Sequence, residues 1–179
     1  MTRNADEEPQ RSPGESSDWR TPLRIDGPKA AVEPKSHLVV GFTRHQSSLA
    51  ALHRGMDLAV RLDAFLHVAH IVDTDDLPVD PDRDDWDEAI ADAVRRERRH
   101  ACDLLASLPG NWAYYSRPGN PAELLMLLAD ANDAEMIIIG TSRGGMLSRM
   151  ERFLGESVSE KLVHRTRRPV LLVPAETSG

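Results

Sequence analysis

The apolar stretch MIII is followed by glycines, arginines and a serine that could together bind an anion. The glycines are Gly140, Gly144, Gly145 and Gly155. Glycine can take positive φ and lets a ligand approach the main chain, so successive N–H groups can point into one anion-binding concavity. A helix that begins at Ser157 would add unpaired N–H groups and its positive end. This stretch could therefore hold a phosphate.

A second interpretation of the same glycines is that they only connect a strand to a helix. Glycines after a strand permit tight turns, and the Ser157–Glu160 spacing is typical of a capping box at any helix start. The chain has no Gly-Lys-Ser/Thr sequence of the Walker type, and no G-x-G-x-x-G follows its first predicted strand. Arg143, Arg149 and Arg152 could add positive charge to a phosphate site. The spacing of the glycines alone leaves both interpretations open.

No catalytic constellation is evident in the sequence. The seven histidines show no metal-ligand spacing, and no G-x-S-x-G motif occurs. His67 and His70, three positions apart in a predicted strand, face opposite sides. Three aspartates at a strand end could hold Mg²⁺ or a ribose, or could form a solvated acidic loop; they are Asp73, Asp75 and Asp76. No nucleophile has an evident activating partner, so the sequence does not predict an enzyme.

Composition excludes several classes of protein. The chain has 179 residues, a formal net charge of -7 and 4% aromatic residues, which disfavours a general nucleic-acid binder. Its single cysteine, Cys102, excludes an internal disulfide and a multi-cysteine metal site. No stretch approaches the roughly 18 apolar residues of a membrane span, and the N-terminus has no apolar signal region. We therefore expect a cytoplasmic protein that contacts neither nucleic acid nor membrane.

Apolar runs and helical patterns alternate along the chain. The predicted strands are 38–42, 64–72, 112–116, 136–140 and 169–174. The predicted helices are 49–62, 86–107, a third that begins at Pro121 after the cap Asn120, and 157–165. Ser47 or Ser48 is the expected cap of the first helix. Residues 1–35, rich in proline, serine and charge, are predicted to be a disordered tail, 36–175 one domain, and 176–179 a short C-terminal tail.

Strands that alternate with helices predict an α/β fold with a parallel, doubly wound sheet. In such sheets ligands bind beyond the carboxyl ends of the strands, where the strand order reverses. Those ends are Gly41–Thr43, Ile71–Asp73 and Gly140–Thr141, so the glycine stretch lies where a small molecule would bind. The apolar run 169–174 would form an exposed edge strand, and such an edge favours pairing with a second copy.

Consecutive segments of the chain resemble the universal stress protein A family over roughly residues 37–174. They are LVVGF followed by SSLAAL, AFLHVAHIVD, GNPAE, MIIIGTSRGG and LGESVSEKLVHRTRRPVLLVP. The resemblance implies a three-layer α/β/α fold with a five-stranded parallel sheet in the order 3-2-1-4-5, of adenine-nucleotide-α-hydrolase-like topology. It also implies a cytoplasmic homodimer, often paired through the last strand, here 169–174. The implied role is in stress resistance, with at most slow ATP hydrolysis.

The resemblance further implies a nucleotide site. One branch of the family binds ATP through a G-x-x-G-x9-G-S/T pattern, and another branch lacks the pattern and binds no nucleotide. ATP, with Mg²⁺, is therefore the expected cofactor. The residues expected at the phosphates are Gly140, Arg143, Gly144, Gly145, Gly155, Ser157 and Val158. Those expected on the adenosine side are Gly41, Phe42, Thr43 and Ile71.

This chain departs from the binding pattern in three places. Thr43 stands where an aspartate usually holds the adenosine, Gly144 comes one position late, and Glu156 intrudes before Ser157. Replacing a charged acceptor by a hydroxyl costs about 1.5–3 kcal/mol, a tenfold to hundredfold loss of affinity. Glu156 would repel phosphates if it faced them, and would favour the helix start if it faced solvent.

Three functions follow from these observations. The first is a dimeric stress regulator that responds to adenine nucleotide. The alternative is a dimeric interaction module without bound nucleotide, in which the tail 1–35 recruits partners. An ATP-cleaving or adenylate-forming enzyme of related fold is a third, and the absence of HIGH-type and SGG-type motifs opposes it.

Overall fold

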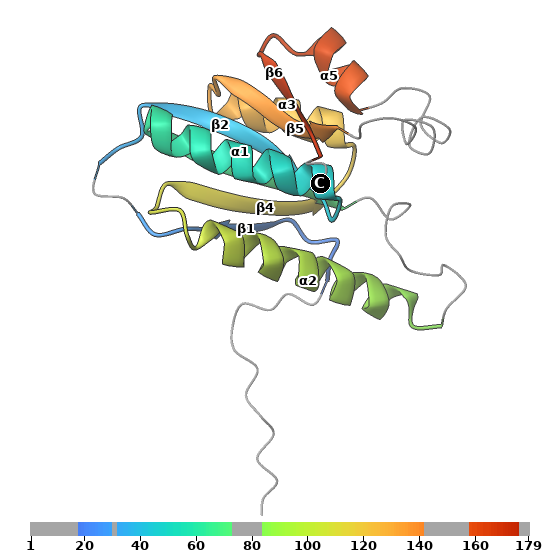
Figure 1. Cartoon of the computed structure of the whole chain (residues 1–179). Helices are drawn as coiled ribbons and strands as arrows, with labels where there is room; N and C mark the ends of the chain where they lie inside the picture. Colours follow the sequence, from blue (N-terminus) through green and yellow to red (C-terminus); the bar gives the residue numbers. More distant parts are fainter. Residues whose placement is uncertain (1–17, 30–31, 73–83, 142–157, 176–179) are drawn as a thin grey trace, which may run out of the picture.

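The computed structural model describes residues 18–29, 32–72, 84–141 and 158–175. They form a six-stranded sheet with helices on both faces (Figure 1). The strands are β1 (Leu23–Asp26), β2 (Ser36–Phe42), β3 (Ala64–Val72), β4 (Trp112–Pro118), β5 (Met136–Thr141) and β6 (Val170–Pro174). The helices are α1 (Gln46–Leu62), α2 (Trp86–Leu105), α3 (Pro121–Ala131) and α5 (Val158–Arg165).

The strand order confirms the predicted α/β class and corrects the strand count. The sheet runs β1-β4-β3-β2-β5-β6. Strands β2 to β6 pair in parallel, and their order is the predicted 3-2-1-4-5. The additional strand β1 pairs with β4 in the antiparallel sense, so the sheet is mixed.

The prediction of a disordered tail over residues 1–35 is wrong for the stretch that contains β1. Leu23 and Ile25 alternate with the charged Arg24 and Asp26, and Ile25 packs against the core. A four-residue alternation among so many charges is too short to stand out in a sequence, and the β4 edge stabilises it. Residues 1–17 and 176–179, also predicted to be tails, lie outside the described part of the chain.

Two hydrophobic clusters lie on opposite faces of the sheet. Along β2, Val40 and Phe42 face the cluster that includes α1 and α2 residues, while Val39 faces the cluster that includes α3 and α5 residues. Leu38, Val39 and Val40 are completely buried. This confirms the prediction, made from the continuous apolar run, that this strand is buried on both faces.

The helix starts agree with the sequence in one case and differ in another. Asn120 caps α3 as predicted, and its Oδ1 accepts a hydrogen bond from the Glu123 N–H at 3.2 Å. Helix α1 instead begins at Gln46 with His45 as N-cap, so neither Ser47 nor Ser48 is the cap. Both serines are buried inside the first turn. The Ser48 hydroxyl is engaged with the end of β2, described below, and this use explains the difference.

Candidate functional site

The candidate site lies where the order of strands in the sheet reverses. Pairing between β2 and β5 runs from Leu38–Met136 to Val40–Ile138, yet β2 continues to Phe42 and β5 to Thr141. On their outer sides both strands stay paired to the end, β2 with β3 and β5 with β6. The carboxyl ends of the parallel strands and the first turn of α1 lie on the same side of the molecule (Figure 1). Such a point in a doubly wound sheet is where ligands bind.

A hydrogen-bonded turn fixes the loop that follows β2. The Thr43 N–H donates to Ser48 Oγ at 2.7 Å, and the Ser48 hydroxyl donates to the Gly41 carbonyl at 3.3 Å. The Thr43 hydroxyl accepts a longer bond from the His45 N–H, at 3.4 Å. Because Ser48 is buried, these bonds are shielded from water and hold Thr43 in one place at the strand end.

Gly140 has a packing role that the glycine pattern did not indicate. A Cβ added at Gly140 would lie 2.3 Å from the main-chain carbonyl carbon and oxygen of Ser47. Real Cβ atoms do not approach that closely, so any side chain here would push α1 away from β5. The close approach at Gly140 is therefore to the protein's own helix. For this glycine the geometry supports the connector interpretation.

The residues predicted on the adenosine side meet at one edge, but two of their side chains belong to the core. Phe42 is 2% exposed and its ring stands edge-on to His70. Ile71 is 7% exposed and packs on the opposite face of the sheet, in the cluster that contains Leu125. Only the main chain of Phe42 and Ile71 is placed to meet a ligand. Thr43, half-buried, keeps its side chain at the edge.

Most of the predicted phosphate site lies outside the described residues. It comprises Arg143, Gly144, Gly145, Gly155 and Ser157, and the same holds for Asp73, Asp75 and Asp76. Val158 is described: it is the first residue of α5 and packs against the α3–α5 cluster. Within the described ranges, no group of three or more histidine, cysteine or acidic side chains could hold a metal ion. The phosphate cradle thus stays a prediction.

A buried polar network, which the sequence did not reveal, joins α2 to the sheet. His70 Nε2 lies 2.8 Å from Glu97 Oε2, and His70 Nδ1 lies 2.7 Å from the Tyr114 hydroxyl. The side chains of His70 and Glu97 are 3% and 13% exposed, and burial raises the pKa of Tyr114. In the arginine-rich stretch of α2, Arg96 and Arg99 are exposed, whereas the Glu97 side chain turns toward the sheet. A single acid inside an arginine-rich run gives no signal of such a partner.

A second polar network, which contains a pair of histidines, lies on the other face of the sheet, as the spacing of His67 and His70 predicted. His37 Nδ1 is 3.0 Å from His67 Nε2, and His67 Nδ1 is 3.0 Å from the Tyr115 hydroxyl. Burial, with the nearby charges of His37 and Arg24, lowers the pKa of His67 to about 4. His67 is therefore a neutral, structural side chain near pH 7, and it lies near the middle of β3, before Ile71.

Comparison with solved structures found many similar chains. A universal stress protein in complex with cAMP is 24% identical, with a TM-score of 0.54, over 80% of this chain and 100% of that chain. A universal stress protein family member from Burkholderia pseudomallei is 26% identical, with a TM-score of 0.55, over 78% and 96%. A family protein from Arabidopsis thaliana with AMP bound is 15% identical, with a TM-score of 0.55, over 79% and 93%. Comparison with curated proteins found no significant match.

The fold and the strand order agree with a match to a family model. The model is that of the universal stress protein family, and it covers residues 36–174. In the parts that the structure describes, no helix has the length and apolar character needed to cross a membrane. Because the matched region spans most of the chain and all five parallel strands, the chain belongs to the universal stress protein family.

Proposed function

We propose that this protein is a cytoplasmic stress regulator that binds an adenine nucleotide, ATP with Mg²⁺, at the carboxyl ends of β2, β3 and β5. The observation that carries the proposal is the reversal of strand order between β2 and β5, where pairing stops while both strands continue. Two proteins of similar fold hold cAMP and AMP, which supports an adenine nucleotide as the ligand.

Main-chain groups would make most of the contacts in this proposal. Helix α5 begins at Val158, and the positive end of the helix dipole there favours an anionic phosphate. The glycines from Gly144 to Gly155 would supply further N–H groups. Thr43, held by Ser48, would face the ribose. Mg²⁺ would be held mainly by the phosphate oxygens and water, as is usual for this ion.

Thr43 gives the proposal a sharp test. A carboxylate at this position accepts two hydroxyl hydrogen bonds, whereas the Thr43 hydroxyl already accepts a bond from the His45 N–H. We expect Thr43→Asp to tighten ATP binding tenfold or more, by about 1.5–3 kcal/mol. Thr43→Asn is the matched control, because it has the same shape without the charge. Isothermal titration calorimetry of all three proteins measures the difference.

Two results would contradict this proposal. One is the absence of heat at millimolar ATP for the native protein and for Thr43→Asp. The other is an ATP affinity that Thr43→Asp leaves unchanged, since that would place the ribose elsewhere. Mass spectrometry of gently purified, then denatured protein provides an independent readout, because a bound nucleotide is released with the chain.

The second candidate function is a dimeric interaction module without nucleotide. Two observations favour it: the space beside Gly140 is occupied by the Ser47 main chain, and the Phe42 side chain is in the core. The described edge of the sheet therefore offers few side chains that could line a pocket for a nucleotide base. This candidate keeps the dimer through β6 and assigns partner recruitment to the N-terminal tail. Affinity capture with the full chain and with a chain lacking residues 1–17 separates the candidates, because only this one requires the tail.

A further inference from the structure

Residues 18–29 form a strap that lies outside the region matched by the family model. The strap runs antiparallel along β4, from Leu23 opposite Ser116 to Asp26 opposite Ala113. Beyond the strand, the Gly27 N–H donates to the Trp112 carbonyl at 2.9 Å. A Cβ on Gly27 would lie 2.3 Å from the Trp112 indole, so glycine is required for the strap to cross this ring. This end of the strap is firmly seated.

The other end of the strap reaches the edge of the sheet where the candidate site lies. Because β1 is antiparallel to β4, residues that precede Leu23 extend toward the carboxyl end of β4. There Trp19 packs edge-on against Trp86 of α2, with ring centroids 6.3 Å apart. Trp19 and Trp86 cover a small cluster that contains Val72, the last residue of β3. Val72 directly follows Ile71, whose main chain we place at the nucleotide.

The contacts at this end of the strap are weaker than those at Gly27. Arg20 and Asp87 form an ion pair at 2.6 Å, but their side chains are 50% and 62% exposed, and such pairs stabilise little. Two buried indole N–H groups lack a hydrogen-bond partner among the described residues, the Trp19 Nε1–H at this end and the Trp112 Nε1–H at the Gly27 end. A buried donor without an acceptor opposes closure of the strap.

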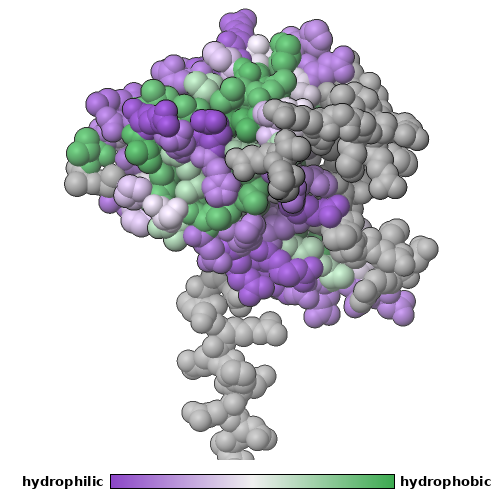
Figure 2. All heavy atoms as spheres, viewed as in Figure 1, coloured by the Kyte–Doolittle hydropathy of each residue, from purple (hydrophilic) through white to green (hydrophobic). Residues whose placement is uncertain are grey.

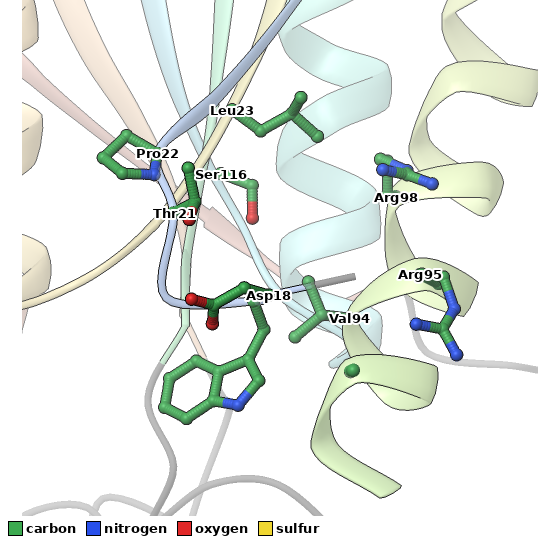
Figure 3. A pocket seen from close by; sticks show the side chains of 10 residues that line it. Asp18, Thr21, Pro22, Leu23, Val94, Arg95, Arg98 and Ser116 are labelled. Carbon is green, nitrogen blue, oxygen red and sulfur yellow. The ribbon is translucent and has the colours of Figure 1, made fainter. Parts of the chain in front are cut away.

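A cavity of about 40 Å³ separates the strap from α2 (Figure 3). Asp18, Thr21 and Leu23 line it from the strap, Val94 and Arg98 line it from α2, and Ser116 from β4 completes the wall. Side chains around a cavity lose packing contacts that a close-packed interior would supply. The strap therefore lies against α2 without the tight fit of the core.

We propose that the strap opens independently of the α/β domain, and that nucleotide bound at the end of β3 closes it. Segments with few buried contacts open at a lower free energy than the core. A ligand that orders the end of β3 also orders Val72, against which Trp19 packs, so it favours the closed strap. The two equilibria are then linked, and each must change the other by the same factor. This inference rests on the proposed nucleotide site.

Hydrogen–deuterium exchange of the full-length protein, read by mass spectrometry, tests the strap. Without nucleotide, we expect the strap amides on the Trp19 side of Gly27, residues 19–25, to exchange at least about tenfold faster than those of β3. Saturating ATP slows the strap amides several-fold. Trp19→Ala removes the contact with Trp86, so it should raise the exchange rate of the strap amides and leave that of the β3 amides unchanged. It should also weaken ATP binding, by about the same factor by which ATP slows exchange in the strap.

Two milder variants keep the proposal testable if the Trp19→Ala protein does not fold. Arg20→Gln removes the ion pair of the strap, and Arg61→Gln removes a comparable exposed pair with Asp57 on α1. Only Arg20→Gln is expected to speed strap exchange, by about twofold to threefold. Equal exchange of strap and β3 would overturn the proposal, and so would strap exchange that ATP leaves unchanged although calorimetry shows it bound. Failure of ATP to bind at all would overturn both this inference and the proposed function.

Discussion

At the scale of single residues, the candidate site depends on groups that shape the main chain. Ser48 holds the loop after β2 through the Thr43 N–H and the Gly41 carbonyl, and Gly140 allows α1 to sit against β5. Neither residue needs to touch a ligand to matter. Their effects should therefore be measurable first as changes in stability, and separately as changes in ATP affinity.

Gly140→Ala should strongly destabilise the protein. The added methyl group would meet the Ser47 main chain at 2.3 Å, and main-chain atoms of a helix cannot move aside locally, so we expect a loss of at least about 3 kcal/mol. Gly41→Ala is the matched control. Its methyl group would meet side-chain atoms of Ile139 and Leu125 at 3.1 and 3.3 Å, which can shift, so we expect a loss below about 1.5 kcal/mol. Urea unfolding of both variants measures the free energies, and equal losses would contradict the packing role of Gly140.

His67 should make the protein less stable in acid. Its pKa is lowered from about 6.5 in the unfolded chain to about 4 in the folded protein, so the unfolded chain binds the proton more tightly. The contribution of neutral His67 to the free energy of unfolding is fully present above pH 6.5. It is lost as the pH falls towards 4, by about 3 kcal/mol. Urea unfolding between pH 7 and pH 4 should show a smaller loss for His67→Gln than for the native protein. Identical pH profiles would contradict this assignment.

At the scale of elements, the sequence predicted those whose patterns are long and local. The run 38–42, the Asn120–Pro121 helix start and the apolar stretch before Gly140 each contain their own signal, and all three are confirmed. β1 could not be predicted, because its four residues are stabilised by pairing with β4 far along the chain. The same holds for the His70–Glu97 contact, since its partners are distant in sequence. Non-local pairing is what a pattern search cannot detect.

The cap of α3 offers a prediction at this scale. Asn120→Ala removes the acceptor of the Glu123 N–H, and we expect a loss of about 1 kcal/mol in the free energy of unfolding. Asn120→Ser keeps a side-chain oxygen at the same position and should restore most of the stability. Thermal and urea unfolding measure both variants. If Ser and Ala at this position proved equally destabilising, the cap would not be the source of the effect.

At the scale of the whole molecule, the two edges of the sheet differ. Strand β1 covers the edge of β4 and carries the charged Arg24 and Asp26, which discourages pairing with another chain. At the other edge, β6 carries Leu172, which is 42% exposed. Figure 2 shows hydrophobic residues gathered over β6 and the adjoining part of α1. The β6 edge is thus the better candidate for contact with a second copy.

We therefore expect the protein to be a homodimer paired through β6. Leu172→Lys places a charge in the pairing surface and should convert the dimer to monomer at micromolar concentration. Leu127→Lys is the matched control, because Leu127 is also exposed, at 62%, and its helix α3 packs over β2, β3 and β5. Light scattering after size exclusion gives the mass of each. A native protein that is monomeric, or a dimer that Leu172→Lys leaves intact, would contradict pairing through β6.

The nucleotide site is tested most directly by a calorimetric titration of the native protein and Thr43→Asp with ATP in the presence of Mg²⁺. If main-chain groups at the ends of β2, β3 and β5 form a nucleotide site, one ATP binds per chain and the added carboxylate tightens binding tenfold or more, by about 1.5–3 kcal/mol. No binding by either protein at millimolar ATP would show that this edge of the sheet holds no adenine nucleotide.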